Sequence, residues 1–250
     1  MLRKLFLTSL TLSVAGIFLS CASTPNDPSL GGDLEVARQF NETGQYRKAV
    51  AALQDIRRKN QQNPTVEAYL GYAFMGLNDY SAASAAYEKS LALEPKNQDV
   101  RFNYAYALII QKRYNDARKH LKKIEDDANY PYMEKVHANV GLSYLEEKHC
   151  NLAHQKFEEA LRLDPTLTSA HYNNGKCYMI EKKYSQAITS FNQAVDSCQG
   201  CIDPYLDLTR AYFKNGQGKI AREKLNTILI NKPDALTEAR VKQILQENKK

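Results

Sequence analysis

Small and bulky apolar residues recur along the chain with a period of about 34 residues. The small position is alanine in six places, spaced by 34, 34, 36, 34 and 34 residues: Ala49, Ala83, Ala117, Ala153, Ala187 and Ala221. A bulky apolar residue follows each alanine four positions later: Leu53, Tyr87, Leu121, Phe157, Phe191 and Leu225. Because residues four apart share one face of an α-helix, this pattern predicts six helices with equivalent buried faces.

A second set of positions predicts a partner helix in every copy. Small residues lie 12 positions before the alanines: Ala37, Gly71, Ala105, Gly141, Gly175 and Thr209. Three residues after them come aromatic or leucine side chains: Phe40, Phe74, Leu108, Tyr144, Tyr178 and Tyr212. Prolines end the second helix in three copies, at Pro95, Pro165 and Pro233. The small residues indicate that the two helices of each copy cross at close range.

These columns resemble the tetratricopeptide repeat (TPR) over residues 30 to about 235. The resemblance implies an all-α fold, a right-handed TPR superhelix (α-solenoid) of six helix-turn-helix repeats within residues 33–233. The repeats are expected at about 30–63, 64–97, 98–133, 134–167, 168–201 and 202–233. Residues 234–250 are expected to form a capping helix and tail. Asp234 would be its N-cap, and the apolar face would be formed by Leu236, Val241, Ile244 and Leu245.

The first 32 residues have the features of an export signal followed by a tether. Arg3 and Lys4 precede an apolar run over residues 5–20, which is short for a membrane-spanning helix. The stretch Phe18-Leu19-Ser20-Cys21 resembles a bacterial lipobox, which implies that residues 1–20 are a signal peptide and that Cys21 carries lipid, palmitate included. A signal anchor that stays attached is the alternative, and the cysteine argues against it.

Small, polar and Pro/Gly-rich residues after the cysteine predict a flexible lipidated tether over residues 21–32. Residue 22 is alanine and not aspartate. By resemblance to the sorting rule of enteric lipoproteins, this implies an outer-membrane location with the folded part facing the periplasm.

Charge and motifs argue against an enzyme or a nucleic-acid-binding protein. A net charge of +6 over 250 residues is too small to indicate nucleic acid. The chain has no Gly-rich phosphate loop, GxSxG or HExxH motif, so we expect no catalytic residue, no cofactor and no small-molecule substrate. His149, Cys150 and His154 are close in sequence, but their places in the repeat favour turn packing and solvent exposure over a metal site.

Four cysteines follow Cys21 and allow three disulfide connectivities in an exported protein: Cys150, Cys177, Cys198 and Cys201. The antiparallel packing of the fourth and fifth repeats favours a Cys150–Cys177 disulfide. Cys198 and Cys201 share one short link and form the second expected pair. Two alternatives remain open: buried free thiols, and a redox-active Cys-x-x-Cys, although the latter lacks a βαβ context.

The first helices of a TPR array line a concave groove, at positions 5, 9, 12 and 13 of each repeat. Large apolar residues at these positions form the predicted partner groove: Tyr72, Met75, Phe102, Tyr106, Ile109, Ile110, Leu142, Leu145, Tyr172 and Met179. Such residues suit an apolar or amphipathic segment of a protein partner. The alternative is that superhelical curvature buries them against neighbouring repeats.

The whole arrangement resembles the type IV pilus secretin pilotins of the PilF/PilW/Tgl group. The most specific part is the lengthened link Ala128-Asn129-Tyr130-Pro131, which leads through Val136 into Asn139-Val140-Gly141-Leu142. The resemblance implies an outer-membrane lipoprotein scaffold that binds secretin subunits and promotes their localisation and assembly into the secretin ring. The alternative is a TPR lipoprotein adaptor of another envelope complex, such as the β-barrel assembly or the peptidoglycan and division machinery.

Overall fold

The computed structural model describes residues 28–59, 62–127, 129–198 and 200–249. The predicted signal peptide, the predicted lipidation site Cys21 and most of the predicted tether lie outside these residues. The described chain forms two compact units, divided between Pro131 and Tyr132. We call them the N-terminal unit and the C-terminal unit. Their boundary falls in the link between the third and fourth repeats, where the 34-residue period lengthens to 36.

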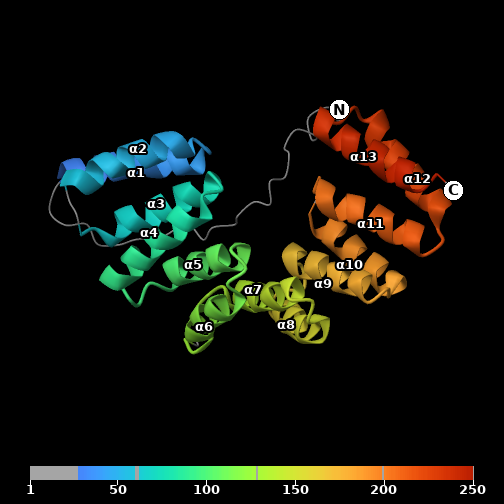
Figure 1. The fold of residues 1–250 in the computed structure, drawn as a ribbon, viewed down its shortest axis with the longest axis horizontal. Coiled ribbons are helices and arrows are strands. Elements are labelled where there is room, and N and C mark those ends of the chain that lie inside the picture. The colour runs from blue at the N-terminus through green and yellow to red at the C-terminus, as the bar shows by residue number, and fades with distance from the viewer. Residues whose placement is uncertain (1–27, 60–61, 128, 199, 250) are drawn as a thin grey trace. The chain divides into compact units, whose positions relative to one another are not determined.

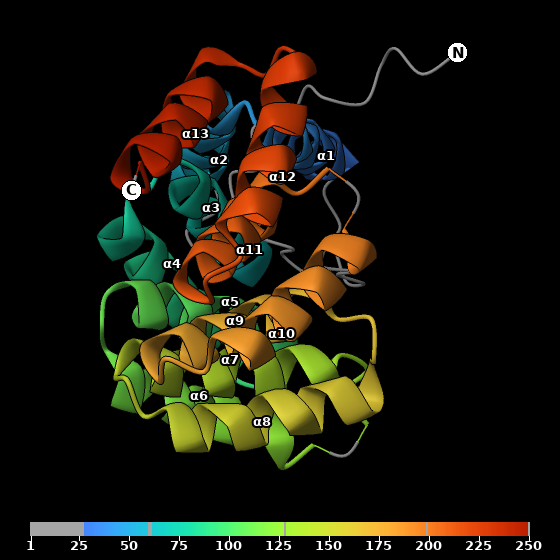
Figure 2. The same ribbon diagram turned by 90° about the vertical axis from the view of Figure 1, so that its right-hand side faces the viewer.

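The described residues form thirteen α-helices and confirm the all-α, TPR-like packing of paired helices (Figure 1). The N-terminal unit contains α1 (Pro28–Glu42), α2 (Tyr46–Lys59), α3 (Pro64–Gly76), α4 (Tyr80–Leu93), α5 (Gln98–Ile110) and α6 (Tyr114–Glu125). The C-terminal unit, yellow to red in Figure 2, contains α7 (Met133–Glu146), α8 (Cys150–Leu163), α9 (Thr168–Ile180), α10 (Tyr184–Ser197), α11 (Ile202–Lys214), α12 (Gly218–Ile230) and α13 (Ala235–Glu247). Within each unit every helix contacts the next, and α1–α3, α3–α5, α7–α9 and α11–α13 also touch.

A left-handed residue closes the turn between the two helices of every repeat. Its φ lies between 59° and 78° at six equivalent positions: Gly44, Asn78, Lys112, Lys148, Lys182 and Gly216. The next residue donates its N–H to a carbonyl five positions back, as from Arg113 to Leu108 at 2.9 Å and from Lys183 to Tyr178 at 2.8 Å. This is the Schellman arrangement, which satisfies helix-end carbonyls and reverses the chain.

The small residues of the first helices make room for specific side chains of the second helices. A Cβ added at Gly71, Gly141 or Gly175 would lie 2.5–2.6 Å from the ring of Tyr87, Phe157 or Phe191, respectively. The repeats with Leu53, Leu121 and Leu225 in place of the ring have Ala37, Ala105 and Thr209 at the small position. The close approach predicted from the sequence therefore involves a ring packed onto a backbone, and the smallest residue faces the largest partner.

The two ends of the described chain differ in part from the sequence-based expectations. α1 begins at Pro28, so the last five residues of the predicted tether, 28–32, are helical. Proline is compatible with a first helical turn, which explains why the helix extends this far. At the other end, Asp234 caps α13 by accepting from Thr237 N at 2.9 Å, and Val241 and Ile244 pack into the core. Leu236 is 66% exposed, so its assignment to that apolar face was wrong.

Candidate protein-binding surface

The ten predicted groove residues differ strongly in exposure. Four are only 3–6% exposed and belong to the core: Met75, Phe102, Ile109 and Leu145. The other six are partly exposed, or half-buried: Tyr72, Tyr106, Ile110, Leu142, Tyr172 and Met179. Contacts between the first helices of neighbouring repeats cover one edge of each of these helices. The prediction of a ten-residue contact surface is therefore wrong for the four core residues, for which the alternative of burial against neighbours holds.

In the N-terminal unit, tyrosines from the second helix of one repeat lie beside groove positions on the first helix of the next repeat. The ring of Tyr46 at the start of α2 covers Gly76, where an added Cβ would lie 2.4 Å from it. The same ring meets Tyr72 edge-on, with centroids 6.3 Å apart. Tyr80 is the equivalent of Tyr46 one repeat later, and Tyr106 is the equivalent of Tyr72. We call Tyr46, Tyr72, Tyr80, Tyr106 and Ile110 the tyrosine face.

The hydroxyl groups of Tyr72 and Tyr106 stay protonated at neutral pH. Burial raises the pKa of Tyr72, with smaller contributions from Tyr46 and Glu42. Burial likewise raises the pKa of Tyr106, with Tyr80 as the second cause. Each of these two hydroxyls can therefore donate a hydrogen bond to a partner, while its ring offers apolar area. The Tyr80 hydroxyl already donates to the Asn78 side-chain oxygen at 2.8 Å. Tyr46 and Tyr80 were not among the predicted groove residues, although they recur with the 34-residue spacing of the repeats.

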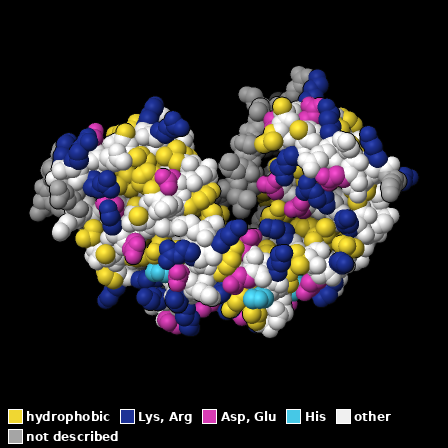
Figure 3. Space-filling model, in the orientation of Figure 1, with side chains coloured by type: hydrophobic (Ala, Val, Ile, Leu, Met, Phe, Trp, Pro, Cys, Tyr) yellow, Lys and Arg dark blue, Asp and Glu magenta, His cyan; other side chains and the backbone are white. Residues whose placement is uncertain are grey.

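The corresponding positions in the C-terminal unit are tied into polar pairs. Tyr172 donates to an Asp207 carboxylate oxygen at 2.7 Å, and Arg210 pairs with the other oxygen at 2.6 Å. Lys176 lies 4.0 Å from Glu146 and 5.7 Å from the centre of the Tyr172 ring. The predicted apolar character therefore fits Tyr172 less well than the tyrosine face. In Figure 3, hydrophobic side chains gather around α3, whereas charges of both signs are interspersed over α11 and α13.

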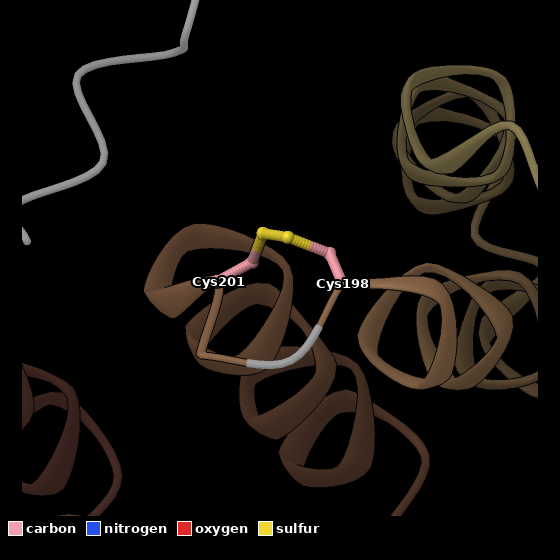
Figure 4. Close-up of a disulfide and its surroundings, with 2 residues drawn as sticks. All are labelled: Cys198 and Cys201. Carbon is pink, nitrogen blue, oxygen red and sulfur yellow. A yellow bond between two sulfur atoms is a disulfide. The ribbon is translucent and has the colours of Figure 1, made fainter. Parts of the chain in front are cut away.

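The structure links Cys198 and Cys201 by a disulfide, with Cα atoms 5.6 Å apart (Figure 4). The prediction of a Cys150–Cys177 disulfide was wrong, since both cysteines are free and buried. The Cys150 thiol is directed at the Cys177 backbone carbonyl, 3.7 Å away. Burial, followed by a side-chain hydrogen bond with Cys150, raises the pKa of the Cys177 thiol, so Cys177 remains a neutral thiol rather than a nucleophile.

The three residues considered for a metal site have separate environments. His149 is exposed at the start of α8, whereas Cys150 is buried. His154 reaches α9, where its Nδ1 contacts Asn174 and its Nε2 lies 3.3 Å from a Glu181 carboxylate oxygen. Its ring also stacks on Tyr178 at 4.4 Å. The nitrogens of His154 thus join α8 to α9.

Comparison with known families agrees with the helix pairing. The Tetratricopeptide repeat family matches residues 74–140 and again residues 168–200. The 34-residue pattern, the Schellman turns and the ring-to-glycine contacts continue beyond the matched residues. The chain is a TPR repeat protein, a class that serves protein–protein interaction and is typically non-enzymatic. Among the described residues, no helix combines the length and the apolar character needed to cross a bilayer.

Several solved structures share this fold at low identity. The type IV pilus biogenesis factor PilW superimposes with a TM-score of 0.76 and 17% identity, covering 88% of this chain and 99% of PilW. PilF of Pseudomonas aeruginosa gives a TM-score of 0.68 and 21% identity over 88% of this chain and 97% of PilF. The APC/C assembly Cut9–Hcn1 also gives 0.68, at 15% identity, over 85% of this chain but 42% of the matched chain.

A curated relative is the DnaJ protein P58IPK homolog of Arabidopsis thaliana, 23% identical over 181 residues. The match covers 71% of this chain but 31% of that protein, so this chain spans about a third of the relative's length. At these identities the similarities show the fold.

Proposed function

We propose that this chain is a lipid-anchored scaffold of the outer membrane that binds subunits of the type IV pilus secretin and promotes their assembly into the secretin ring. The lipid would be carried by Cys21, and the folded TPR array would face the periplasm. The scaffold acts by binding alone, with no chemical step of its own.

The observation that carries the proposal is the extent of the match to PilW. The shared fold covers 99% of PilW and 97% of PilF, so the array of paired helices has nearly the same extent in all three proteins. The match to Cut9–Hcn1 covers less than half of that much longer chain. The N-terminal lipobox and the lengthened link around Tyr130 and Pro131 agree with the same group.

The tyrosine face is the surface we assign to the subunit. It combines half-buried rings with hydroxyl donors, and its side chains have few rotatable bonds to order on binding. A partner segment with apolar side chains would cover Tyr72, Tyr106 and Ile110, while its polar backbone or side-chain acceptors meet the tyrosine hydroxyls. Such a segment would be exposed in a secretin monomer and buried after ring assembly.

A deletion strain tests the function. Membrane fractions from the strain are run unboiled on a gel and blotted for the pilus secretin. We expect loss of the heat-resistant multimer and accumulation of monomer. A normal multimer would refute the pilotin assignment. The remaining alternative would then be an adaptor of another envelope complex, such as the β-barrel assembly or the peptidoglycan and division machinery.

Point variants test the surface. Tyr106→Ala combined with Ile110→Ala removes two partly exposed side chains, and we expect at least tenfold weaker binding of the purified secretin subunit with unchanged helicity. The matched control is Leu93→Ala, which truncates a 41% exposed leucine at the end of α4 in the same unit. Equal binding by the double variant, the control and the unmodified chain would exclude the tyrosine face as the contact.

A further inference from the structure

Three of the turns that lead from one repeat to the next, those that follow α4, α8 and α10, share one backbone hydrogen bond. In each, the residue at the start of the new repeat donates its N–H to the carbonyl three positions back. The distances are 3.2 Å from Asn97 to Glu94, 3.1 Å from Leu167 to Asp164 and 3.2 Å from Cys201 to Cys198. These turns occupy equivalent places in the 34-residue pattern, so their side chains can be compared directly.

Side chains also link residues within each of these turns, and the kind of link differs from one turn to the next. We call this link the side-chain tie. At the first, the Asn97 amide donates to a Glu94 carboxylate oxygen at 2.9 Å. At the second, Asp164 accepts from the backbone N–H and the hydroxyl of Thr166, at 2.9 and 2.7 Å. At the third, the Cys198–Cys201 disulfide joins the same two positions that Glu94 and Asn97 occupy (Figure 4).

We propose that the Cys198–Cys201 disulfide is a covalent replacement for this side-chain tie, and that α11–α13 become fully ordered only after a disulfide donor has oxidised the pair. Asn97 also caps α5 by accepting from Val100 N at 3.1 Å, whereas Cys201 makes no side-chain cap for α11. Leu167 likewise makes no side-chain cap for α9, so of these three turns only the one at Asn97 has a hydrogen-bonding cap. At α11 the disulfide supplies the restraint that the Asn97 side chain gives to α5.

Loosening the start of α11 would affect the elements packed on it. α11 contributes the fully buried Leu206 and Leu208, and Leu206 shares a cluster with Val241 and Ile244 of α13. Arg240 of α13 also pairs with Asp203 in the first turn of α11. The Cys198–Cys201 disulfide thus restrains the start of α11, the helix on which α13 packs.

The exposure of the two residues sets the order of the exchange reaction. Cys198 is partly exposed, whereas Cys201 is 5% exposed. The Cys198 thiolate attacks the donor disulfide, which forms a mixed disulfide and releases one donor thiolate. The Cys201 thiolate then attacks the Cys198 sulfur and releases the second donor thiolate. The two cysteine thiols are oxidised, the donor disulfide is reduced to a dithiol, and two protons pass through solvent to the donor.

Hydrogen exchange on the full chain tests the tie. Oxidised protein is compared with protein reduced by a phosphine, and labelling confirms two additional free thiols. Since loop closure in the unfolded chain is the main effect of a disulfide, we expect exchange in α11–α13 to become on the order of tenfold faster after reduction. Exchange in α7 should change less than twofold. Equal exchange in α11–α13 before and after reduction would overturn the proposal.

Two double variants separate the tie from the sulfur chemistry. Cys198→Ala with Cys201→Ala removes the tie and should exchange like reduced protein. Cys198→Glu with Cys201→Asn introduces the Glu94–Asn97 pair at the third turn, and should restore protection to within about threefold of oxidised protein and be insensitive to reductant. Equal exchange by both double variants would show that the tie is not what orders α11.

Single variants test the order of attack. With the aromatic disulfide DTNB as donor, Cys201→Ala leaves the partly exposed Cys198 and should react at least tenfold faster than Cys198→Ala, which leaves the buried Cys201. The opposite ranking would reverse the assigned roles.

Discussion

The contact between Gly141 and Phe157 offers a direct test of how the helix pairs fit together. A Cβ at Gly141 would lie 2.6 Å from Cε1 of Phe157, whose side chain is fully buried. Gly141→Ala gains about 1 kcal/mol of helix propensity. The overlap with a ring that cannot move away costs about 1–3 kcal/mol. We expect a net loss of up to about 2 kcal/mol in the free energy of unfolding.

A second substitution should relieve the overlap. Phe157→Leu alone removes buried carbons and should cost about 1–2 kcal/mol. Gly141→Ala with Phe157→Leu recreates the pairs Ala37–Leu53 and Ala105–Leu121 of the first and third repeats. The double variant should therefore be less destabilised than the sum of the single variants, by about 1–2 kcal/mol.

Urea denaturation followed by circular dichroism measures all four members of this cycle. Gly32→Ala is the control for helix propensity, because a Cβ at this exposed position of α1 meets nothing within 4 Å. It should be neutral or stabilising. Additive effects of Gly141→Ala and Phe157→Leu, or a stabilising Gly141→Ala, would refute the argument that the ring determines the glycine.

Three further changes test other parts of the fold. Gly216→Ala places a Cβ at φ 78° with open space around it, and should cost about 1 kcal/mol in thermal or urea denaturation through the backbone alone. Burial, followed by the nearby Arg101 and Lys123, lowers the pKa of His120 from 6.5 to about 4. Its stabilising effect is therefore complete above pH 6.5 and is lost as the pH falls towards 4, and His120→Gln should flatten this part of the stability–pH curve. Tyr172→Phe removes the hydrogen bond to Asp207 and should lower the free energy of unfolding by about 1–2 kcal/mol, measured in urea; an unchanged midpoint would show that water replaces the bond.

The repeat architecture could be predicted from the sequence because its columns reflect local contacts within a repeat. The small residue at Gly175 and the ring at Phe191 are sixteen residues apart and belong to adjacent helices. The burial of Met75 and Ile109 depends instead on contacts between repeats. Their apolar character is equally consistent with a core and with a binding surface, so the pattern alone could not separate the two.

For the cysteines, too, the sequence predicts which residues lie close together but not how their side chains are oriented. Cys198 and Cys201 share one short turn, so their proximity follows from the sequence alone. Cys150 and Cys177 also lie close together, but the direction of the Cys150 thiol depends on the rotation of α8 against α9. Likewise, the sequence pattern places Tyr172 among the apolar groove residues. Its hydroxyl donates to Asp207, which lies 35 residues further along the chain in α11, so this hydrogen bond depends on how the helices pack.

The fit between ring and small residue lies entirely inside each repeat, and this restricts how such a chain can be rearranged during evolution. Duplication or exchange with joints in the turns between repeats keeps Gly71 with Tyr87 and Gly175 with Phe191. A joint inside a repeat could place the Phe157 ring opposite an alanine such as Ala105. The viable crossover points of the gene are therefore expected to fall at the repeat boundaries, and each repeat can be inherited as a matched pair of helices.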